Sequence, residues 1–302
     1  MRALAIACAI WALALPAAAW AQVAAPAFNP FTIRESGNPA VQQWRPDSFV
    51  GAGLADGTLD QPTQTADISG KFAQLTLVGE RLSFGLSWLS NDLTVPEGSA
   101  QQTFAAASVA GRLADWLSLG VGLEKGEFDT AAQEDEASLP IAGASVRLGE
   151  SFYLGAALGK EKRTVTQFGP PASVDASRSV TRLGLGALWR SDVSALHLEA
   201  YREERKDYDF PLPVGSRDGF RANWLVAEAN MRGVLLGVAS AKETDVSGSN
   251  PRDKRVTRLV VGWAPRAGFT VAYLGIREKT EDSLGAFVEE VKVNAVGLGW
   301  SF

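Results

Sequence analysis

The last seven residues alternate strictly between apolar and small side chains. They read Val296-Gly297-Leu298-Gly299-Trp300-Ser301-Phe302. Because strand side chains point alternately to opposite faces, the four apolar residues share one face. Such an apolar edge is an aggregation hazard in water, whereas it is favourable on a strand that closes a barrel in lipid. The pattern predicts a transmembrane β-barrel strand that ends at Trp300 and Phe302.

Alternation of this kind recurs from about residue 45 to the end of the chain. Longer polar links lie near 57–66, 96–100, 130–136, 169–175, 209–218, 246–253 and 283–286. Between them lie short turns at Gly79-Glu80, Ala114-Asp115, Gly149-Glu150, Ser191-Asp192, Arg232-Gly233 and Arg266-Ala267. Gly, Pro, Asn and Asp favour such connections. The connections predict an all-β, antiparallel, up-and-down barrel of about fourteen strands over 45–302, with the short turns on the periplasmic side.

The start of the chain differs from the rest. Arg2, an uncharged apolar run and a small-x-small site at Ala19-Trp20-Ala21 predict a signal peptide over 1–21. Its removal would take away Cys8, the only cysteine, so the mature chain would lack thiolate chemistry. Residues 22–44 carry Pro26, Pro30 and Pro39 and do not alternate, which indicates a plug in the lumen or a periplasmic tail.

The ending also resembles the C-terminal signal of bacterial outer-membrane barrels, so we expect Trp300 and Phe302 to serve membrane insertion. The expected partners are the lipid bilayer, the outer-membrane assembly machinery and a possible protein in the lumen or at the loops. We expect no cofactor, no metal and no nucleic acid, because the net charge is −5 and neither a ligand cluster nor a basic patch occurs.

The aromatic residues predict two girdles at the membrane interfaces. The periplasmic girdle comprises Trp116, Phe152, Trp189, Trp263, Phe269, Trp300 and Phe302. The outer girdle comprises Phe104, Phe128, Phe168, Phe210, Phe220 and Phe287. In the last strand Val291 and Val293 are out of phase with Trp300. A bulge near Asn294 would return both to the lipid face and turn Glu290 and Lys292 inward.

A short motif gives the best indication of function. Asn38-Pro39-Ala40 ends the pre-barrel segment and is followed by Trp44, Ser48-Phe49 and the small residues Gly51-Ala52-Gly53. This arrangement resembles the FadL family of hydrophobic-compound transporters. The resemblance implies a fourteen-stranded barrel and a plug that Asn38-Pro39-Ala40 holds at the barrel wall beside a lateral exit. Its motif covers only about residues 36–55, and the short outer loops here offer no hydrophobic capture groove.

Inward-facing charges are the remaining candidate site residues. By alternation they are Arg81, Arg112, Arg147, Arg182, Glu124, Glu199, His197 and Arg258. The arginines near the short turns could draw an anion inward, or could pair with acidic neighbours and lipid headgroups; we favour the second interpretation. Because His197 lies mid-strand between leucines and Ser194 faces the wrong side, we expect no enzyme.

Three functions therefore fit the sequence. The first is a FadL-like channel for small hydrophobic or amphipathic compounds in the bacterial outer membrane. The second is a general diffusion porin, and the third is a structural or assembly barrel that anchors a partner protein. The inward face is rich in glycine, which leaves room in the lumen for water, a plug or a partner.

Overall fold

The computed structural model describes residues 38–44, 48–62, 64–95, 98–131, 133–168, 171–191, 194–209, 219–245, 252–265, 268–282 and 286–302. The expected signal peptide, most of the pre-barrel segment, Phe210 and Arg266 lie outside the described residues. The structure therefore does not test the division of the chain before residue 38.

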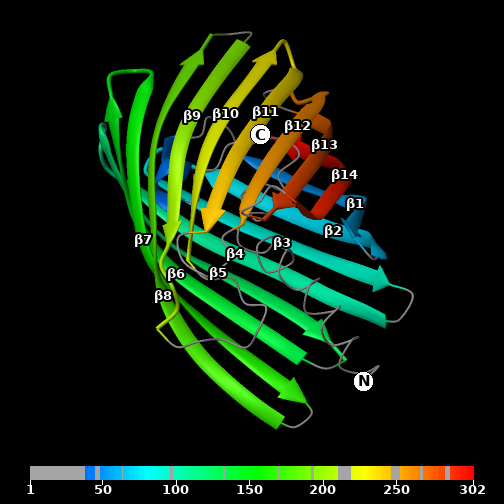
Figure 1. Cartoon of the computed structure of the whole chain (residues 1–302). Helices are drawn as coiled ribbons and strands as arrows, with labels where there is room; N and C mark the ends of the chain where they lie inside the picture. The colour runs from blue at the N-terminus through cyan, green and yellow to red at the C-terminus, as the bar shows by residue number, and fades with distance from the viewer. Residues whose placement is uncertain are drawn as a thin grey trace.

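Fourteen antiparallel strands close into a single barrel in chain order, with β1 paired to β14 (Figure 1). Before them lies one 3-10 helix, η1 (Pro39–Trp44). The first seven strands are β1 (Phe49–Gln61), β2 (Gln64–Val78), β3 (Leu82–Val95), β4 (Gly98–Ala114), β5 (Leu117–Thr130), β6 (Gln133–Leu148) and β7 (Phe152–Phe168). The second seven are β8 (Pro171–Arg190), β9 (Ser194–Arg205), β10 (Phe220–Met231), β11 (Val234–Asp245), β12 (Asp253–Trp263), β13 (Gly268–Glu281) and β14 (Phe287–Ser301).

The barrel and its strand count confirm the sequence prediction. Each predicted short turn falls between the paired strands expected, from β2–β3 to β12–β13. At the β10–β11 turn both Arg232 and Gly233 have positive φ, which suits a tight hairpin. We call this end of the barrel, where η1 also lies, the turn end, and the opposite end the loop end. Among the described residues no helix is long and apolar enough to cross a membrane.

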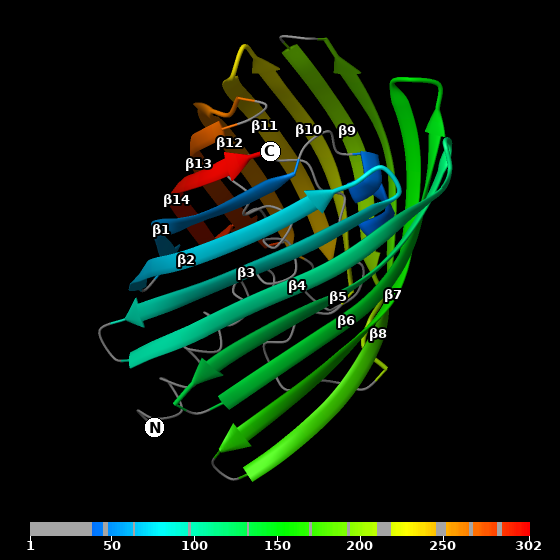
Figure 2. The same cartoon turned by 180° about the vertical axis from the view of Figure 1, so that it is seen from behind.

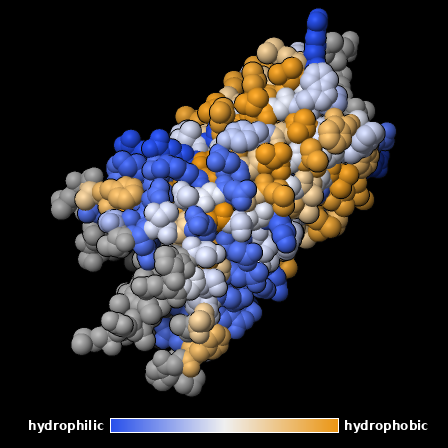
Figure 3. Space-filling view, turned by 90° about the vertical axis from the view of Figure 1, so that its right-hand side faces the viewer, coloured by the Kyte–Doolittle hydropathy of each residue, from blue (hydrophilic) through white to orange (hydrophobic). Residues whose placement is uncertain are grey.

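The outer wall changes character along the barrel axis. Towards the turn end the outward side chains are large and apolar, and the predicted girdle is exposed there at Trp116, Phe152, Trp189, Trp263, Phe269, Trp300 and Phe302. Towards the loop end they are charged, as with Lys242, Arg277 and Lys292. Figure 3 shows the apolar side chains gathered over one end and polar ones over the other. A closed barrel with such a belt fits a bilayer at its turn end and water at its loop end.

The predicted outer aromatic girdle is wrong for three of its members. Phe104, Phe128 and Phe220 point into the lumen and are buried in the apolar cluster there. Phe168 and Phe287 are exposed as expected. Whether each phenylalanine points into the lumen or outward is set by the alternation along its strand. Its distance from a loop does not decide this.

The predicted bulge near Asn294 is also wrong. β14 pairs with β1 in one unbroken register from Ser301 to Glu290. Val291 and Val293 are therefore buried in the lumen, while Lys292 lies outside and pairs with Asp60 at 3.3 Å. The physical reason is that this part of the wall faces water, so apolar groups favour the inside.

The lumen consequently has two unlike sides. An apolar side is formed by β1–β4 and β10–β14 and includes Leu59, Phe72, Leu89, Trp224 and Leu274. A charged side is formed by β5–β9 and carries buried ion pairs. Most buried ion pairs of the described lumen thus lie on the second side, although the apolar side also holds Arg258 and the Lys254–Glu278 pair.

Candidate functional site

The Asn-Pro-Ala motif is docked against the inner wall at the turn end. The Asn38 side-chain amide donates hydrogen bonds to the carbonyl oxygens of Ala144 at 3.0 Å and Ala156 at 3.2 Å. Its Oδ1 accepts from the Ala40 amide at 3.0 Å, which shapes the start of η1. Figure 2 shows η1 inside the barrel, and it contacts β3 to β7. Since Asn38 satisfies backbone groups of β6 and β7, it joins this segment to the wall.

Glycines on four strands make room for the docked segment. A Cβ at Gly120 would lie 2.6 Å from the Ala40 nitrogen, and one at Gly143 would lie 2.0 Å from Asn38 Oδ1. Gly155 approaches the Asn38 amide, and Gly85 approaches Gln42. For these four positions the sequence interpretation of a glycine-rich face as space for another element is confirmed.

The end of η1 is fixed by polar contacts at the barrel rim. Gln43 Nε2 donates to the Gly79 carbonyl at 2.9 Å, and Trp44 Nε1 donates to Ser145 Oγ at 2.9 Å. The guanidinium carbons of Arg112 and Arg147 lie 5.4 and 5.9 Å from the centroid of the Trp44 ring. Such cation–π contacts help to hold an aromatic ring in place. The structure thus brings Arg112 and Arg147 together on Trp44.

Arg81 does not join this group, because it is exposed in the turn before β3. Two described members of the candidate ring of arginines near the short turns, Arg112 and Arg147, meet the docked segment. Arg147 also donates to the Glu150 carbonyl at 2.6 Å. These contacts are made with an aromatic ring and a backbone carbonyl, so the favoured pairing of the arginines with acidic neighbours and lipid headgroups stays a prediction.

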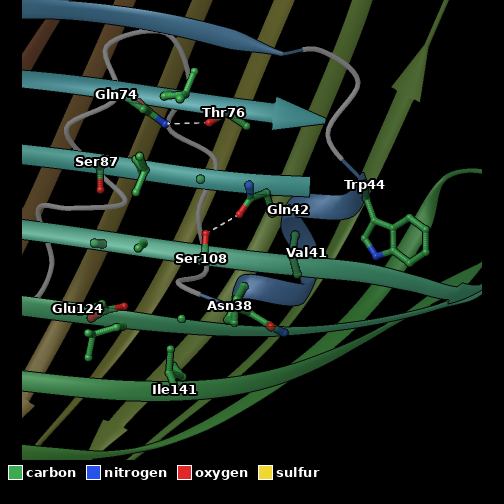
Figure 4. Close-up of a pocket in the computed structure, with 18 of the residues that line it drawn as sticks. Asn38, Val41, Gln42, Trp44, Gln74, Thr76, Ser87, Ser108, Glu124 and Ile141 are labelled. Atoms are coloured by element: carbon green, nitrogen blue, oxygen red, sulfur yellow. Dashed lines mark hydrogen bonds between the residues drawn. The ribbon is translucent and has the colours of Figure 1, made fainter. Parts of the chain in front are cut away.

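A cavity of about 120 Å³ lies beside η1. Asn38, Val41 and Gln42 form one wall of it, and Gln42 Oε1 accepts a hydrogen bond from Ser108 Oγ at 2.6 Å (Figure 4). Val41, Ile141, Tyr153 and Leu188 give it apolar surface, and polar groups such as Gln74, Thr76, Glu124 and Glu199 line the rest. The site is therefore amphipathic, which is the usual character of small-molecule pockets.

His197 lies at the edge of this cavity. Its Nε2 is hydrogen-bonded to the Tyr153 hydroxyl at 2.8 Å and lies 3.7 Å from Glu199 Oε2. Both His197 and Glu199 are buried and inward, as the alternation predicts. Ser194 lies at the β8–β9 turn, where its hydroxyl contacts that of Ser191 at 2.8 Å. The pairing of a serine with His197 that a hydrolase needs is thus not formed by Ser194.

Glu124 and Arg182 meet on the charged side of the lumen. Arg182 donates to Glu124 Oε1 at 2.6 Å and to Glu203 Oε2 at 2.7 Å. Arg205 donates to the other oxygen of Glu203 at 2.6 Å. The network continues through the pairs Arg205–Glu161, Arg178–Glu161 and Arg163–Asp135. Each buried charge in it has a partner of opposite sign, which burial requires.

The segment after β9 closes this network from the loop end. The Tyr208 hydroxyl donates to Glu161 at 2.5 Å, and the Arg178 guanidinium lies 4.3 Å from the Tyr208 ring centroid. Burial, together with the Glu161 carboxylate, raises the pKa of Tyr208 to about 12. The hydroxyl therefore stays protonated and keeps donating at physiological pH.

Sequence reasoning missed most of this network. The inward charges not singled out are Asp135, Glu161, Arg163, Arg178, Glu203 and Arg205. The signal was present in β7, because Tyr153 and Gly155 face inward and the same parity places Glu161 and Arg163 inward. No group of His, Cys, Asp and Glu in the described part of the chain could hold a metal ion.

No family model matches this chain, and no curated protein sequence matches it. Solved structures do match, at low sequence identity. The CymD monoaromatic hydrocarbon channel has 12% identity and a TM-score of 0.55, over 92% of this chain and 93% of that one. The toluene transporter TodX of P. putida has 9% identity and a TM-score of 0.51, over 87% and 92%. A Pseudomonas aeruginosa FadL homologue has 10% identity and a TM-score of 0.51, over 91% and 93%.

These structures and this chain share one fold. The fold expected from the Asn38-Pro39-Ala40 motif, a fourteen-stranded barrel, is therefore confirmed. At identities this low the likeness is one of architecture. The role of the site rests on its own geometry.

Proposed function

We propose that this chain is an outer-membrane channel for small hydrophobic or amphipathic compounds. In this proposal residues 38–44 act as a hatch at the periplasmic end of the lumen. The observation that carries it is the docking of Asn38 on β6 and β7 beside a cavity. Proteins of the same fold are described as a monoaromatic hydrocarbon channel and a toluene transporter, which supports the proposal.

The size of the cavity favours a compound of one ring. An apolar protein cavity of roughly 150 Å³ binds benzene. The cavity beside η1 is of similar size, about 120 Å³, which suits a compound of about one aromatic ring. The apolar side of the lumen would carry such a compound from the loop end.

A lateral exit beside the motif would use the wall strands near η1. β3 pairs without a register shift to both β2 and β4, whereas the register shifts between Arg112 and Ala114 in the β4–β5 pair. A hollow on the outer surface lies opposite the cavity, and both are lined by Gln74, Leu75, Leu86, Ser87, Ala106, Ala107 and Leu123. In this proposal, movement of the hatch opens the exit.

Deletion of residues 22–40 from the mature chain tests the hatch. The purified variant and wild type would be reconstituted into liposomes for toluene uptake and into planar bilayers for conductance. We expect a higher conductance and altered toluene uptake in the variant. Unchanged behaviour in both assays would exclude the hatch.

The two alternatives give different results in the same experiments. A general diffusion porin would show a stable wild-type conductance that toluene does not affect. An assembly barrel would take up no toluene and would co-purify with a stoichiometric partner protein.

A further inference from the structure

Arg258 is a buried cation on the apolar side of the lumen. It lies on β12 with only 3% of its surface exposed. Its strand neighbours on the same face, Val256 and Val260, are fully buried, and its cross-strand partners are Ala239 and Ile276. An arginine at such a position is unusual, because its guanidinium remains charged in proteins.

Within the described part of the chain, the guanidinium of Arg258 contacts one aromatic ring. Its carbon lies 4.4 Å from the centroid of the Trp224 ring. Trp224 is in turn stacked on Tyr201, with ring centroids 5.7 Å apart and an interplanar angle of 6°. Ala239 on β11 lies between β12 and β10, and its small side chain leaves room for Arg258 to reach Trp224.

Arg258 has no ion pair or hydrogen bond with the described residues, and its Nε is buried without a partner. Glu243 and Glu278 act on it electrostatically, yet Glu278 is ion-paired with Lys254. The other deeply buried arginines of the lumen differ, because each contacts a carboxylate; they are Arg163, Arg178, Arg182 and Arg205.

A buried charge without a partner is costly, and a cation–π contact offsets only part of that cost. The donors of a guanidinium match the two oxygens of a carboxylate. A ligand carboxylate would therefore supply the ion-pair partner that the Arg258 guanidinium lacks among the described residues.

We propose that Arg258 binds the carboxylate of a small aromatic acid whose ring lies against the apolar side of the lumen. This inference rests on the proposed channel function and names a substrate class for it. The ring of the ligand would contact inward apolar groups near Arg258, such as Val226, Leu274 and Ile276. An anionic compound would thus be selected over its neutral isostere.

Calorimetric titration of the purified full-length mature protein in detergent tests this selection. The ligands are sodium benzoate, benzamide as its neutral isostere, and toluene. We expect wild type to bind benzoate at least tenfold more tightly than benzamide. Equal affinities for the two in wild type would overturn the inference without any variant being needed.

Two variants of β12 locate the effect. Arg258→Gln should lose the preference for benzoate, with its benzoate affinity reduced at least tenfold and its toluene affinity within twofold of wild type. Arg255→Gln removes the same charge three residues away on the exposed outer face and should leave all three affinities unchanged. A benzoate affinity that survives Arg258→Gln, or an equal loss for all three ligands, would also overturn the inference.

Uptake into liposomes separates this inference from the channel function. If toluene and benzamide enter but Arg258→Gln does not change benzoate entry, only the role of Arg258 fails. If none of the three compounds enters with wild type, the channel function itself fails.

Discussion

Asn38 occupies the space that a side chain at Gly143 would need, since a Cβ there would lie 2.0 Å from Asn38 Oδ1. The two residues are far apart in sequence, one before the barrel and one in the middle of β6. Their contact shows that the wall is shaped to receive the docked segment. The glycine is therefore part of the site.

Gly143→Ala should displace the hatch without disturbing the barrel. The added methyl group cannot coexist with Asn38 in its present position, whereas its distance of 3.3 Å from the Ala156 carbonyl oxygen needs only a small shift of the wall. We expect a several-fold higher single-channel conductance in planar bilayers. Gly98→Ala is the matched control, because a Cβ there meets nothing within 4 Å. Equal conductance in the two variants would contradict the assigned contact.

Asn38→Ala should weaken the docking of residues 38–44 by a change in the segment itself rather than in the wall. It removes the hydrogen bonds to Ala144 and Ala156 and the one from the Ala40 amide, each worth about 1 kcal/mol. Docking should weaken by about 1–3 kcal/mol. Hydrogen exchange at Val41, whose amide donates to the Asn38 carbonyl at 3.1 Å, should accelerate accordingly. Asn223→Ala, on the outer face of β10, should leave that exchange unchanged.

The architecture could be predicted from the sequence because side chains alternate between the two faces of every barrel strand with a period of two residues. Two-residue turns and alternation placed all six hairpin turns of the turn end. The same reasoning failed at Val291 and Phe104, since it took the outer wall to be apolar over its whole height. Near the loop end the wall meets water, so the alternation persists while its polarity is inverted.

The site was only partly accessible. The alternation along each strand predicted that Arg182, Glu199 and Arg258 point inward, and all three are buried in the lumen. It could not say which charges meet, because contacts such as Arg182 with Glu124 join residues 58 apart in the chain and depend on how the barrel closes. The alternation also could not show that the Arg258 guanidinium has no ion pair with a described carboxylate.

Arg182→Met should destabilise the barrel strongly. It leaves Glu124 and Glu203 in the lumen without the cation that both contact. Removing one partner of a buried pair typically costs about 3–5 kcal/mol. Urea unfolding of the purified protein in detergent, followed by tryptophan fluorescence, measures the free energy of unfolding.

Arg202→Met is the control for that loss. Its pair with Glu204 is solvent-exposed, so removal should cost about 1 kcal/mol or less. If Arg182→Met and Arg202→Met lower the free energy of unfolding by similar amounts, the buried ion pairs of Arg182 contribute no more to stability than the exposed pair.

Pro140→Val should strengthen the seam between β6 and β7. The pairing there stops at Ser138 with Lys162 and resumes at Ile141 with Gly159, and proline has no amide hydrogen to complete the ladder. Valine restores the donor, so we expect about 1 kcal/mol of added stability and slower hydrogen exchange at Lys160. Ala142→Val, two residues along the same outward face where the ladder is complete, should change neither quantity. Faster exchange at Lys160 in Pro140→Val would show that the gap has another cause.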